Sequence, residues 1–250
     1  MSKYTVNAGW DHVPHLSEAE KAEQLAAYQP YQREARSKGL PLLGAGSIYP
    51  VPEDYVLCDP FPIPDWMPQC YALDVGWKVT AAVWGAYNAD ADIVYLYSEH
   101  YREHEEPLVH VNAILSRGKW IVGVIDPAAR GRSQKDGERL IDVYRKLGLE
   151  HLYAASNEVE AGIHECWTRL STGRMKVFRT LSNWLQEYRF YQRDEKGRVK
   201  PDQADHAMDA MRYLINSGLV RATVRPASMW KMRGGVATRQ HQADYDPLKY

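Results

Sequence analysis

The sequence predicts an α/β domain whose mixed sheet joins an antiparallel meander to parallel strands and carries helices on both faces. Three observations predict it. Strand-like segments follow one another closely over 69–101, a continuous apolar run lies at 120–125, and amphipathic helical segments separate the later strands. The 250 residues suffice for one domain with a full core plus extensions.

Residues 1–68 are expected to form an N-terminal extension, partly helical and partly a proline-rich linker. Ser17-Glu18-Ala19-Glu20 fits a capping box that opens a helix through Ala27, and a second short helix is expected from Tyr31 to Ser37. Six prolines between Pro50 and Pro68 are too many for a helix or a central strand.

Residues 69–218 are expected to form the folded domain. Strands at Gln69–Val75, Thr80–Tyr87 and Ile93–Tyr101 have short links, which indicates an antiparallel meander. Further strands are expected at 120–125, 151–155 and 175–178, and helices at 105–117, 134–147, 158–170 and 204–216. Residues 181–191 are expected to continue as a helix and then a strand, before a hairpin turn at 194–197. Residues 219–250 show little periodicity and are expected to be a C-terminal tail.

Three aspartates stand in informative places. Asp74 and Asp126 each close an apolar run, and Asp209 lies in the late helix. A lone buried carboxylate is costly unless something compensates its charge, and a shared divalent cation would do so. If the strands that end at Asp74 and Asp126 are neighbours, their carboxylates lie side by side. Carboxylates that meet around two metal ions are typical of phosphodiester hydrolysis.

Two further residues of the late helix are candidate ligands. Asp205 and His206 precede Asp209 by four and three residues, so either could share its face. The alternative is structural: Asp205 favours a helix N-terminus with Asp202 as N-cap, and Asp126 before Pro127 is a strand-ending turn residue.

These motifs resemble the nuclease domain of the large terminase subunit of tailed bacteriophages. The resemblance rests on three motifs: Leu73-Asp74-Val75-Gly76-Trp77, Val124-Ile125-Asp126-Pro127-Ala128 and Asp205-His206-Ala207-Met208-Asp209-Ala210-Met211-Arg212-Tyr213-Leu214. The stretch 10–17 also looks like the region that joins the terminase motor to its nuclease, so the resemblance covers roughly residues 10–217. It implies an RNase H-like fold. It also implies an endonuclease that cuts concatemeric viral DNA, in which genome copies are joined end to end, during genome packaging and with little sequence specificity.

The same resemblance implies roles and partners. Asp74, Asp126 and Asp209 would be the catalytic, metal-binding triad for two Mg²⁺ or Mn²⁺ ions, with Asp205 and His206 beside them. The implied partners are double-stranded DNA, the terminase ATPase motor domain, the small terminase subunit and the portal, in the cytoplasm of the bacterial host. The sequence has no Gly-x-x-x-x-Gly-Lys-[Ser/Thr] phosphate loop, so ATP hydrolysis is not expected.

Two other functions stay open at this point. One is another RNase H-like enzyme, such as a Holliday-junction resolvase or a transposase. The other is a non-catalytic docking domain whose carboxylates are structural. The three cysteines contain no Cys-x-x-Cys pair, which indicates a reducing cytoplasm. The sequence shows no signal peptide and no apolar run of membrane length, so no membrane partner is expected.

The charge is unevenly distributed along the chain. Residues 1–116 hold 7 Lys/Arg against 16 Asp/Glu, whereas residues 117–200 hold 17 against 11. This asymmetry is a hint that one face meets a polyanion, and solvated surface charge is the alternative. The candidate DNA-binding residues are Lys78, Arg130, Arg132, Lys135, Arg193, Lys196, Arg198 and Lys200.

Overall fold

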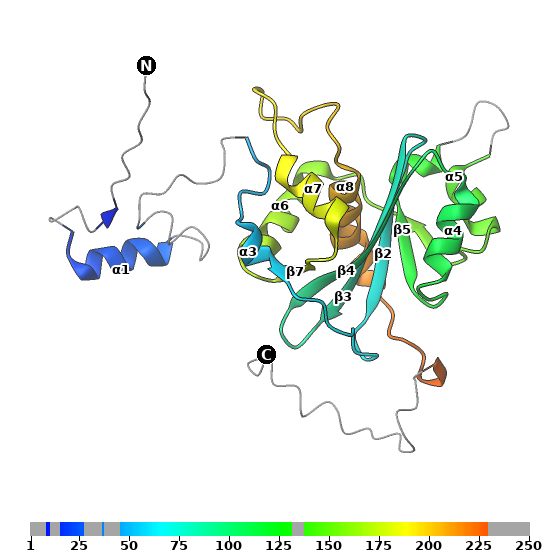
Figure 1. Ribbon diagram of the computed structural model, residues 1–250, viewed down its shortest axis with the longest axis horizontal. Coiled ribbons are helices and arrows are strands. Elements are labelled where there is room, and N and C mark those ends of the chain that lie inside the picture. Colours follow the sequence, from blue (N-terminus) through cyan, green and yellow to red (C-terminus); the bar gives the residue numbers. More distant parts are fainter. Residues whose placement is uncertain (1–8, 11–15, 28–36, 38–45, 132–137, 230–250) are drawn as a thin grey trace.

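The computed structural model of the protein describes residues 9–10, 16–27, 37, 46–131 and 138–229. A seven-stranded mixed sheet runs in the order β1-β7-β4-β3-β2-β5-β6 (Figure 1). The strands are β1 (Leu57–Cys58), β2 (Gln69–Val75), β3 (Val79–Asn88), β4 (Ile93–Glu103), β5 (Val122–Ile125), β6 (Leu152–Ala154) and β7 (Met175–Phe178). The helices are α1 (Glu18–Ala27), α3 (Glu53–Val56), α4 (Pro107–Leu115), α5 (Leu140–Lys146), α6 (Val159–Ser171), α7 (Ser182–Phe190) and α8 (His206–Tyr213).

The predicted meander and the predicted parallel strands are both present. β2 and β3 pair antiparallel from Gln69↔Ala86 to Val75↔Thr80, and β3 and β4 pair antiparallel as well. β5 pairs parallel with β2 and with β6, and β7 pairs parallel with β4 and with β1. The central strand β3 is almost wholly buried, as expected of a strand covered on both faces.

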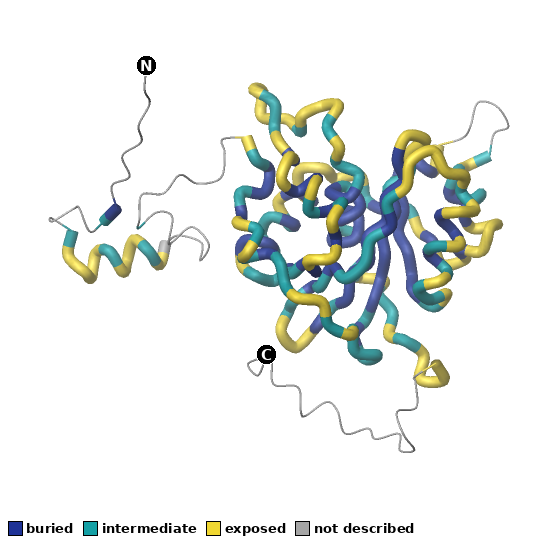
Figure 2. The backbone as a smooth tube through the Cα atoms, in the orientation of Figure 1, coloured by how far each residue is buried: buried dark blue, intermediate teal, exposed yellow. Residues whose placement is uncertain are grey.

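Two apolar clusters cover the two faces of the sheet. Helices α6, α7 and α8 pack on one face, where Val83, Leu96 and Trp184 are among the buried residues. Helices α4 and α5 pack on the other face against Leu73, Trp84 and neighbouring side chains. The buried residues follow the sheet between these two helical layers (Figure 2). The prediction of helices on both faces is therefore confirmed.

The N-terminal predictions have mixed outcomes. The capping box at Ser17 is present, since Glu20 N–H donates to Ser17 Oγ at 3.3 Å and Ser17 N–H donates to Glu20 Oε2 at 2.9 Å. The helix predicted at 31–37 lies, apart from its last residue, outside the described residues.

The expectation of no helix among the prolines is wrong over Glu53–Val56. Pro52 is the N-cap of α3, a position where a missing N–H costs nothing, and no proline follows before β1 ends. Tyr49 and Val56 are buried in the core, so residues 47–58 pack with the sheet. The boundary at residues 68 and 69 stays a prediction.

Two later segments also differ from expectation. The helix predicted from residue 134 begins at Leu140 within the described residues, after an extended Arg139; residues 132–137 lie outside them. Of the residues described directly before this helix, Glu138 and Arg139 are not helical. Part of the predicted tail packs on the sheet, because Thr223 and Gln69 exchange two backbone hydrogen bonds of 2.8 and 3.0 Å. None of the described helices is long and apolar enough to cross a membrane.

Two buried histidines join β4 to α4. His100 Nε2 and His110 Nδ1 are 2.9 Å apart, and His110 Nε2 lies 3.2 Å from the Glu105 carbonyl oxygen. A carbonyl only accepts, so His110 carries its proton on Nε2 and accepts at Nδ1 from His100 Nε2–H. Burial, followed by the charges of His110, Arg117 and Arg102, lowers the pKa of His100 to about 4.

We expect acid to destabilise the protein through this pair. Between the ordinary histidine pKa of 6.5 and about 4, the unfolded chain binds a proton that the folded chain excludes, so the free energy of unfolding falls as the pH falls. The loss attributable to the pair should be roughly 2 kcal/mol. Urea unfolding at neutral and acidic pH measures it. A double variant, His100→Leu with His110→Leu, should lack this part of the pH dependence; identical pH dependence in both proteins would contradict the assignment.

Candidate active site

Asp74 and Asp126 lie side by side at one edge of the sheet. Asp74 is the second-last residue of β2, and Asp126 directly follows β5. Leu73 pairs with Ile125 in the parallel register, and the Asp126 N–H donates to the Leu73 carbonyl at 2.9 Å. The expectation that these strands are neighbours is confirmed. The ends of two adjacent strands thus hold both carboxylates on a rigid support.

Helix α8 contacts these strands and brings further polar side chains to the same edge. His206 Nδ1 lies 2.8 Å from Asp74 Oδ2, and the Tyr213 hydroxyl donates to Asp126 Oδ1 at 3.3 Å. His206 and Tyr213 are separated by about two helical turns, so they share one face of α8. Asp209 stands between them with helical spacing to both and shares that face.

A buried arginine holds Asp209. Arg212 Nη2 and Nε lie 2.8 and 3.3 Å from Asp209 Oδ1, and Arg212 is buried between α8 and α6. A Cβ at Gly162 of α6 would lie 2.6 Å from Arg212 Cγ, so the absence of a side chain at Gly162 makes room for the arginine. Neither Arg212 nor Tyr213 was predicted as a site residue, although their spacing from Asp209 and His206 along the helix was a usable signal.

The carboxylates at this edge affect one another electrostatically. Burial raises the pKa of Asp74, the hydrogen bond from His206 opposes the rise, and the charges of Asp209 and Asp126 add to it. Burial and then the charge of Asp209 raise the pKa of Asp205 to about 6. The hydrogen bond to Asp74 raises the pKa of His206. A bound cation would stabilise this cluster of acidic side chains.

The oxygen donors suit Mg²⁺ or Mn²⁺, but they do not yet form a ligand set. Within the described parts of the chain, no three His, Cys, Asp or Glu side chains are placed so that they could hold a metal ion. Each carboxylate faces its own partner instead: Asp74 faces His206, Asp209 faces Arg212, and Asp126 accepts from the Ala128 N–H at 2.9 Å. The bond to Ala128 is the turn role that the sequence left open for Asp126. The metal-binding roles of Asp74, Asp126, Asp209, Asp205 and His206 stay predictions.

The candidate DNA-binding residues fall into three groups. Lys78 and Arg130 are exposed and follow Asp74 and Asp126 closely in the chain, whereas Arg132 and Lys135 lie outside the described residues. Lys196 and Lys200 are exposed beside the hairpin turn, where Arg193 bridges to Val199 as predicted.

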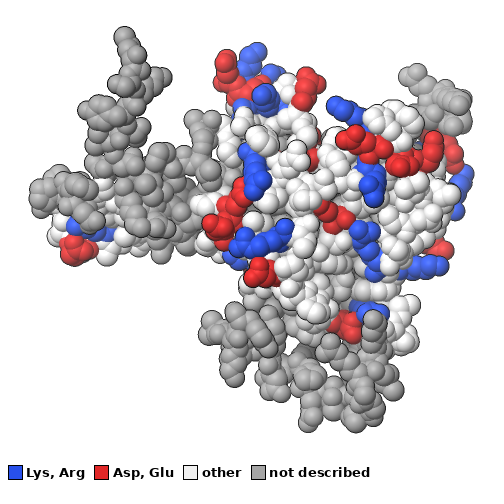
Figure 3. Space-filling view, viewed as in Figure 1, with Lys and Arg blue, Asp and Glu red and all other residues white. Residues whose placement is uncertain are grey.

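The two arginines of that hairpin already have acidic partners. Arg193 Nη2 lies 2.7 Å from Glu160 Oε2, and Arg198 Nη2 lies 3.0 Å from Asp194 Oδ2. They are therefore less available to a phosphate than the sequence suggested. Basic and acidic side chains are intermixed over the face shown in Figure 3.

Comparison with known proteins decides the family. The large terminase subunit of Salmonella phage P22 is 32% identical over 222 residues, which are 85% of this chain and 44% of that protein. The solved nuclease domain of the P22 large terminase matches with a TM-score of 0.67 and 28% identity, over 76% of this chain and all of that domain. The chain belongs to the terminase large-subunit nuclease domains. The predicted family and its RNase H-like, mixed α/β fold are thus confirmed.

More distant structures share the fold of this terminase nuclease, and the curated relatives are longer than the chain. The large terminase nuclease of thermophilic phage G20c, solved with bound cobalt, matches with a TM-score of 0.51 and 11% identity over 70% of this chain and 98% of that one, which shows the fold alone. No family model matches the chain. The chain spans under half the length of the curated P22 and LP7 terminases, at 44% and 46%.

Proposed function

We propose that this terminase nuclease domain is a divalent-metal-dependent endonuclease that cuts concatemeric viral DNA during genome packaging. The observation that carries the proposal is that Asp74 and Asp126 lie at the neighbouring ends of two parallel strands, with Asp209 of α8 near enough for its charge to raise the pKa of Asp74. Membership of the terminase family supports DNA as the substrate. Rigid strand ends supply the fixed geometry that hydrolysis of a phosphodiester requires.

Each residue of the site has a separate role in this proposal. Asp74, Asp126 and Asp209 would hold two Mg²⁺ or Mn²⁺ ions, which, when bound, activate water and stabilise charge on the phosphate. Before metal binds, His206 and Arg212 keep Asp74 and Asp209 oriented and offset their repulsion. Lys78 and Arg130, exposed beside the two strand ends, would contact backbone phosphates without reading base sequence.

The partners follow from the same proposal. We infer that the domain acts in the cytoplasm of the bacterial host together with a terminase ATPase motor domain, the small terminase subunit and the portal. The support for these partners is the similarity of the chain to the large terminase subunits of phages P22 and LP7.

A cleavage assay tests the proposal directly. We expect the protein to nick or linearise supercoiled plasmid in Mg²⁺, to lose this activity in EDTA, and to regain at least as much with Mn²⁺. Cleavage should fall steeply between about 50 and 200 mM salt, because phosphate contacts dominate DNA binding. Cleavage that persists in EDTA would contradict metal dependence. Preference for four-way junctions over duplex DNA would favour the resolvase alternative.

A further inference from the structure

The helix that carries His206 and Asp209 begins without a cap of its own. Asp205 is the N-cap residue of α8, yet among the described contacts its side chain makes no capping hydrogen bond. The first N–H groups of a helix have no partner within the helix and need an acceptor when buried. For α8 the acceptor comes from another helix.

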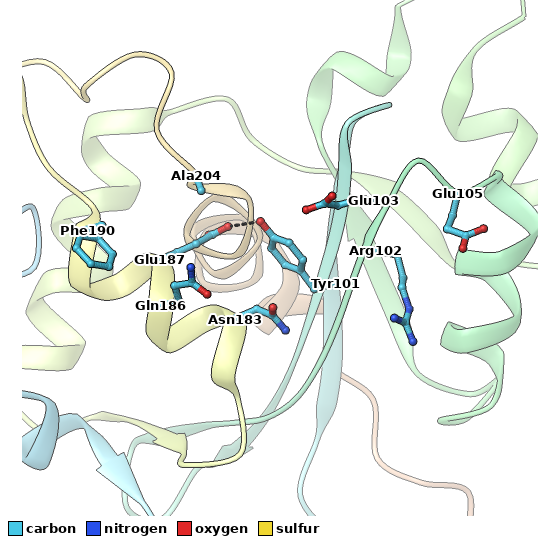
Figure 4. Close-up of a pocket in the computed structure, with 9 residues that line it drawn as sticks. All are labelled: Tyr101, Arg102, Glu103, Glu105, Asn183, Gln186, Glu187, Phe190 and Ala204. Atoms are coloured by element: carbon cyan, nitrogen blue, oxygen red, sulfur yellow. Dashed lines mark hydrogen bonds between the residues drawn. The ribbon is translucent and has the colours of Figure 1, made fainter.

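Glu187 of α7 supplies that acceptor. Its Oε2 accepts from the Ala207 N–H at 2.6 Å and from the Met208 N–H at 3.3 Å. Its Oε1 accepts from the Tyr101 hydroxyl of β4 at 2.9 Å (Figure 4). Glu187 is only 4% exposed, and a buried carboxylate is costly unless its charge is compensated. These three donors and the positive end of the α8 dipole provide that compensation.

Glu187 contacts the helical turn that carries two of the candidate ligands. Ala207 and Met208 lie between His206 and Asp209 in the first turn of α8, so Glu187 holds the turn from which both side chains project. The Tyr101 ring packs edge-on against the His206 ring with centroids 6.4 Å apart. One carboxylate therefore fixes both the helix terminus and the aromatic ring that packs on His206.

We propose that Glu187 is a positioning residue for the metal centre. It sets the height and rotation of α8, and thereby places His206 against Asp74 and Asp209 near both strand ends. This inference rests on the proposed function, because it concerns the same metal site. It adds a residue of α7, remote from the three aspartate motifs in sequence, to those on which the site depends.

The chain offers a matched control in Glu99 of β4. Glu99 Oε2 accepts from the Trp184 N–H at 2.9 Å, and its Oε1 accepts from the Asn183 N–H at 3.0 Å. It thus caps α7 from outside, as Glu187 caps α8. Helix α7 carries Glu187 but none of the candidate ligands, and the Glu99 carboxylate contacts its first turn, before the turn that carries Glu187. Glu99→Ala therefore removes the same kind of interaction and leaves the hydrogen bonds between Glu187 and the first turn of α8 in place.

The experiment compares Glu187→Ala, Glu187→Gln and Glu99→Ala in the full chain. Two quantities are measured: amide hydrogen exchange of residues 206–209 without metal, and Mn²⁺ affinity by electron paramagnetic resonance. Glu187→Ala should speed the exchange about tenfold and weaken Mn²⁺ binding by about tenfold or more. Glu187→Gln should stay within about threefold of wild type in both, because its amide oxygen still accepts from the two N–H groups.

Glu99→Ala should speed exchange at the start of α7 and leave Mn²⁺ affinity within about threefold of wild type. Wild-type exchange and affinity in Glu187→Ala, or equal losses of affinity in Glu187→Ala and Glu99→Ala, would overturn the positioning role alone. A wild-type protein that binds no Mn²⁺ would instead overturn the proposed function and this role with it. If Glu187→Ala does not fold, Tyr101→Phe removes only the hydroxyl that orients Glu187 and should give a smaller loss of affinity in the same direction.

Discussion

Replacing Asp74 by Asn should reduce DNA cleavage by at least about 10³-fold while the protein stays folded. A metal ion contributes several kcal/mol to stabilising the transition state, and each ~1.4 kcal/mol is a factor of ten in rate. Asn has the shape of Asp and its oxygen can still accept from His206, but it lacks the negative charge that would hold the cation. Cleavage of plasmid DNA in Mg²⁺ measures the loss.

Two controls distinguish a loss of catalysis from a loss of folding. Circular dichroism and thermal unfolding should show Asp74→Asn to be folded, since burial without charge removes a desolvation cost at that position. Asp90→Asn, in the exposed turn at the opposite end of β3, removes the same charge far along the strand and should cleave as wild type does. Undiminished cleavage by a folded Asp74→Asn would favour a structural role for the carboxylates and the docking-domain alternative.

Replacing Gly123 by Ala should destabilise the protein by roughly 3 kcal/mol or more, the upper range for overpacking a core. A Cβ at Gly123 would lie 2.0 Å from Tyr71 Cζ and 2.4 Å from the Tyr71 hydroxyl oxygen. Tyr71 is 2% exposed, and its ring packs on Trp84 with centroids 5.7 Å apart, so a shift of the ring disturbs the packing on Trp84. Either the ring or β5, which leads into Asp126, must move.

Urea unfolding measures this loss, and a double-mutant cycle identifies its cause. In a Tyr71→Leu background the ring is absent, so Gly123→Ala should cost at least about 1 kcal/mol less than in wild type. A Gly123→Ala variant within about 0.5 kcal/mol of wild type would show that the sheet accommodates the methyl group. Equal costs in both backgrounds would show that the clash with Tyr71 is not the cause.

Local sequence patterns were sufficient for most of the secondary structure. The alternation and apolar runs at 69–101 and 120–125 depend only on neighbouring residues, and they predicted the meander and the buried strand. The prolines misled over Glu53–Val56, because their effect depends on position within a helix turn rather than on their number.

The positions of the candidate site residues in the fold were predictable where a single segment of the chain contains the information. Asp74, Asp126 and Asp209 stand at strand ends and on a helix face, so their positions follow from the chain itself. The same helical spacing could have identified Arg212 and Tyr213. It could not have identified Glu187, because Glu187 lies on another helix and its role arises only when α7 packs against the start of α8.

Residue patterns along the chain were enough to establish the α/β class, the order of the strands along the chain and the aspartates at the ends of β2 and β5. The partner of each charge is known from the folded protein alone: His206 for Asp74, Arg212 for Asp209, Glu160 for Arg193 and two backbone N–H groups for Glu187. The two kinds of feature differ in how far apart along the chain the interacting residues lie. Secondary structure depends on residues within a few positions, whereas pairing of charges and close packing at Gly123 depend on which distant segments the folded sheet brings together.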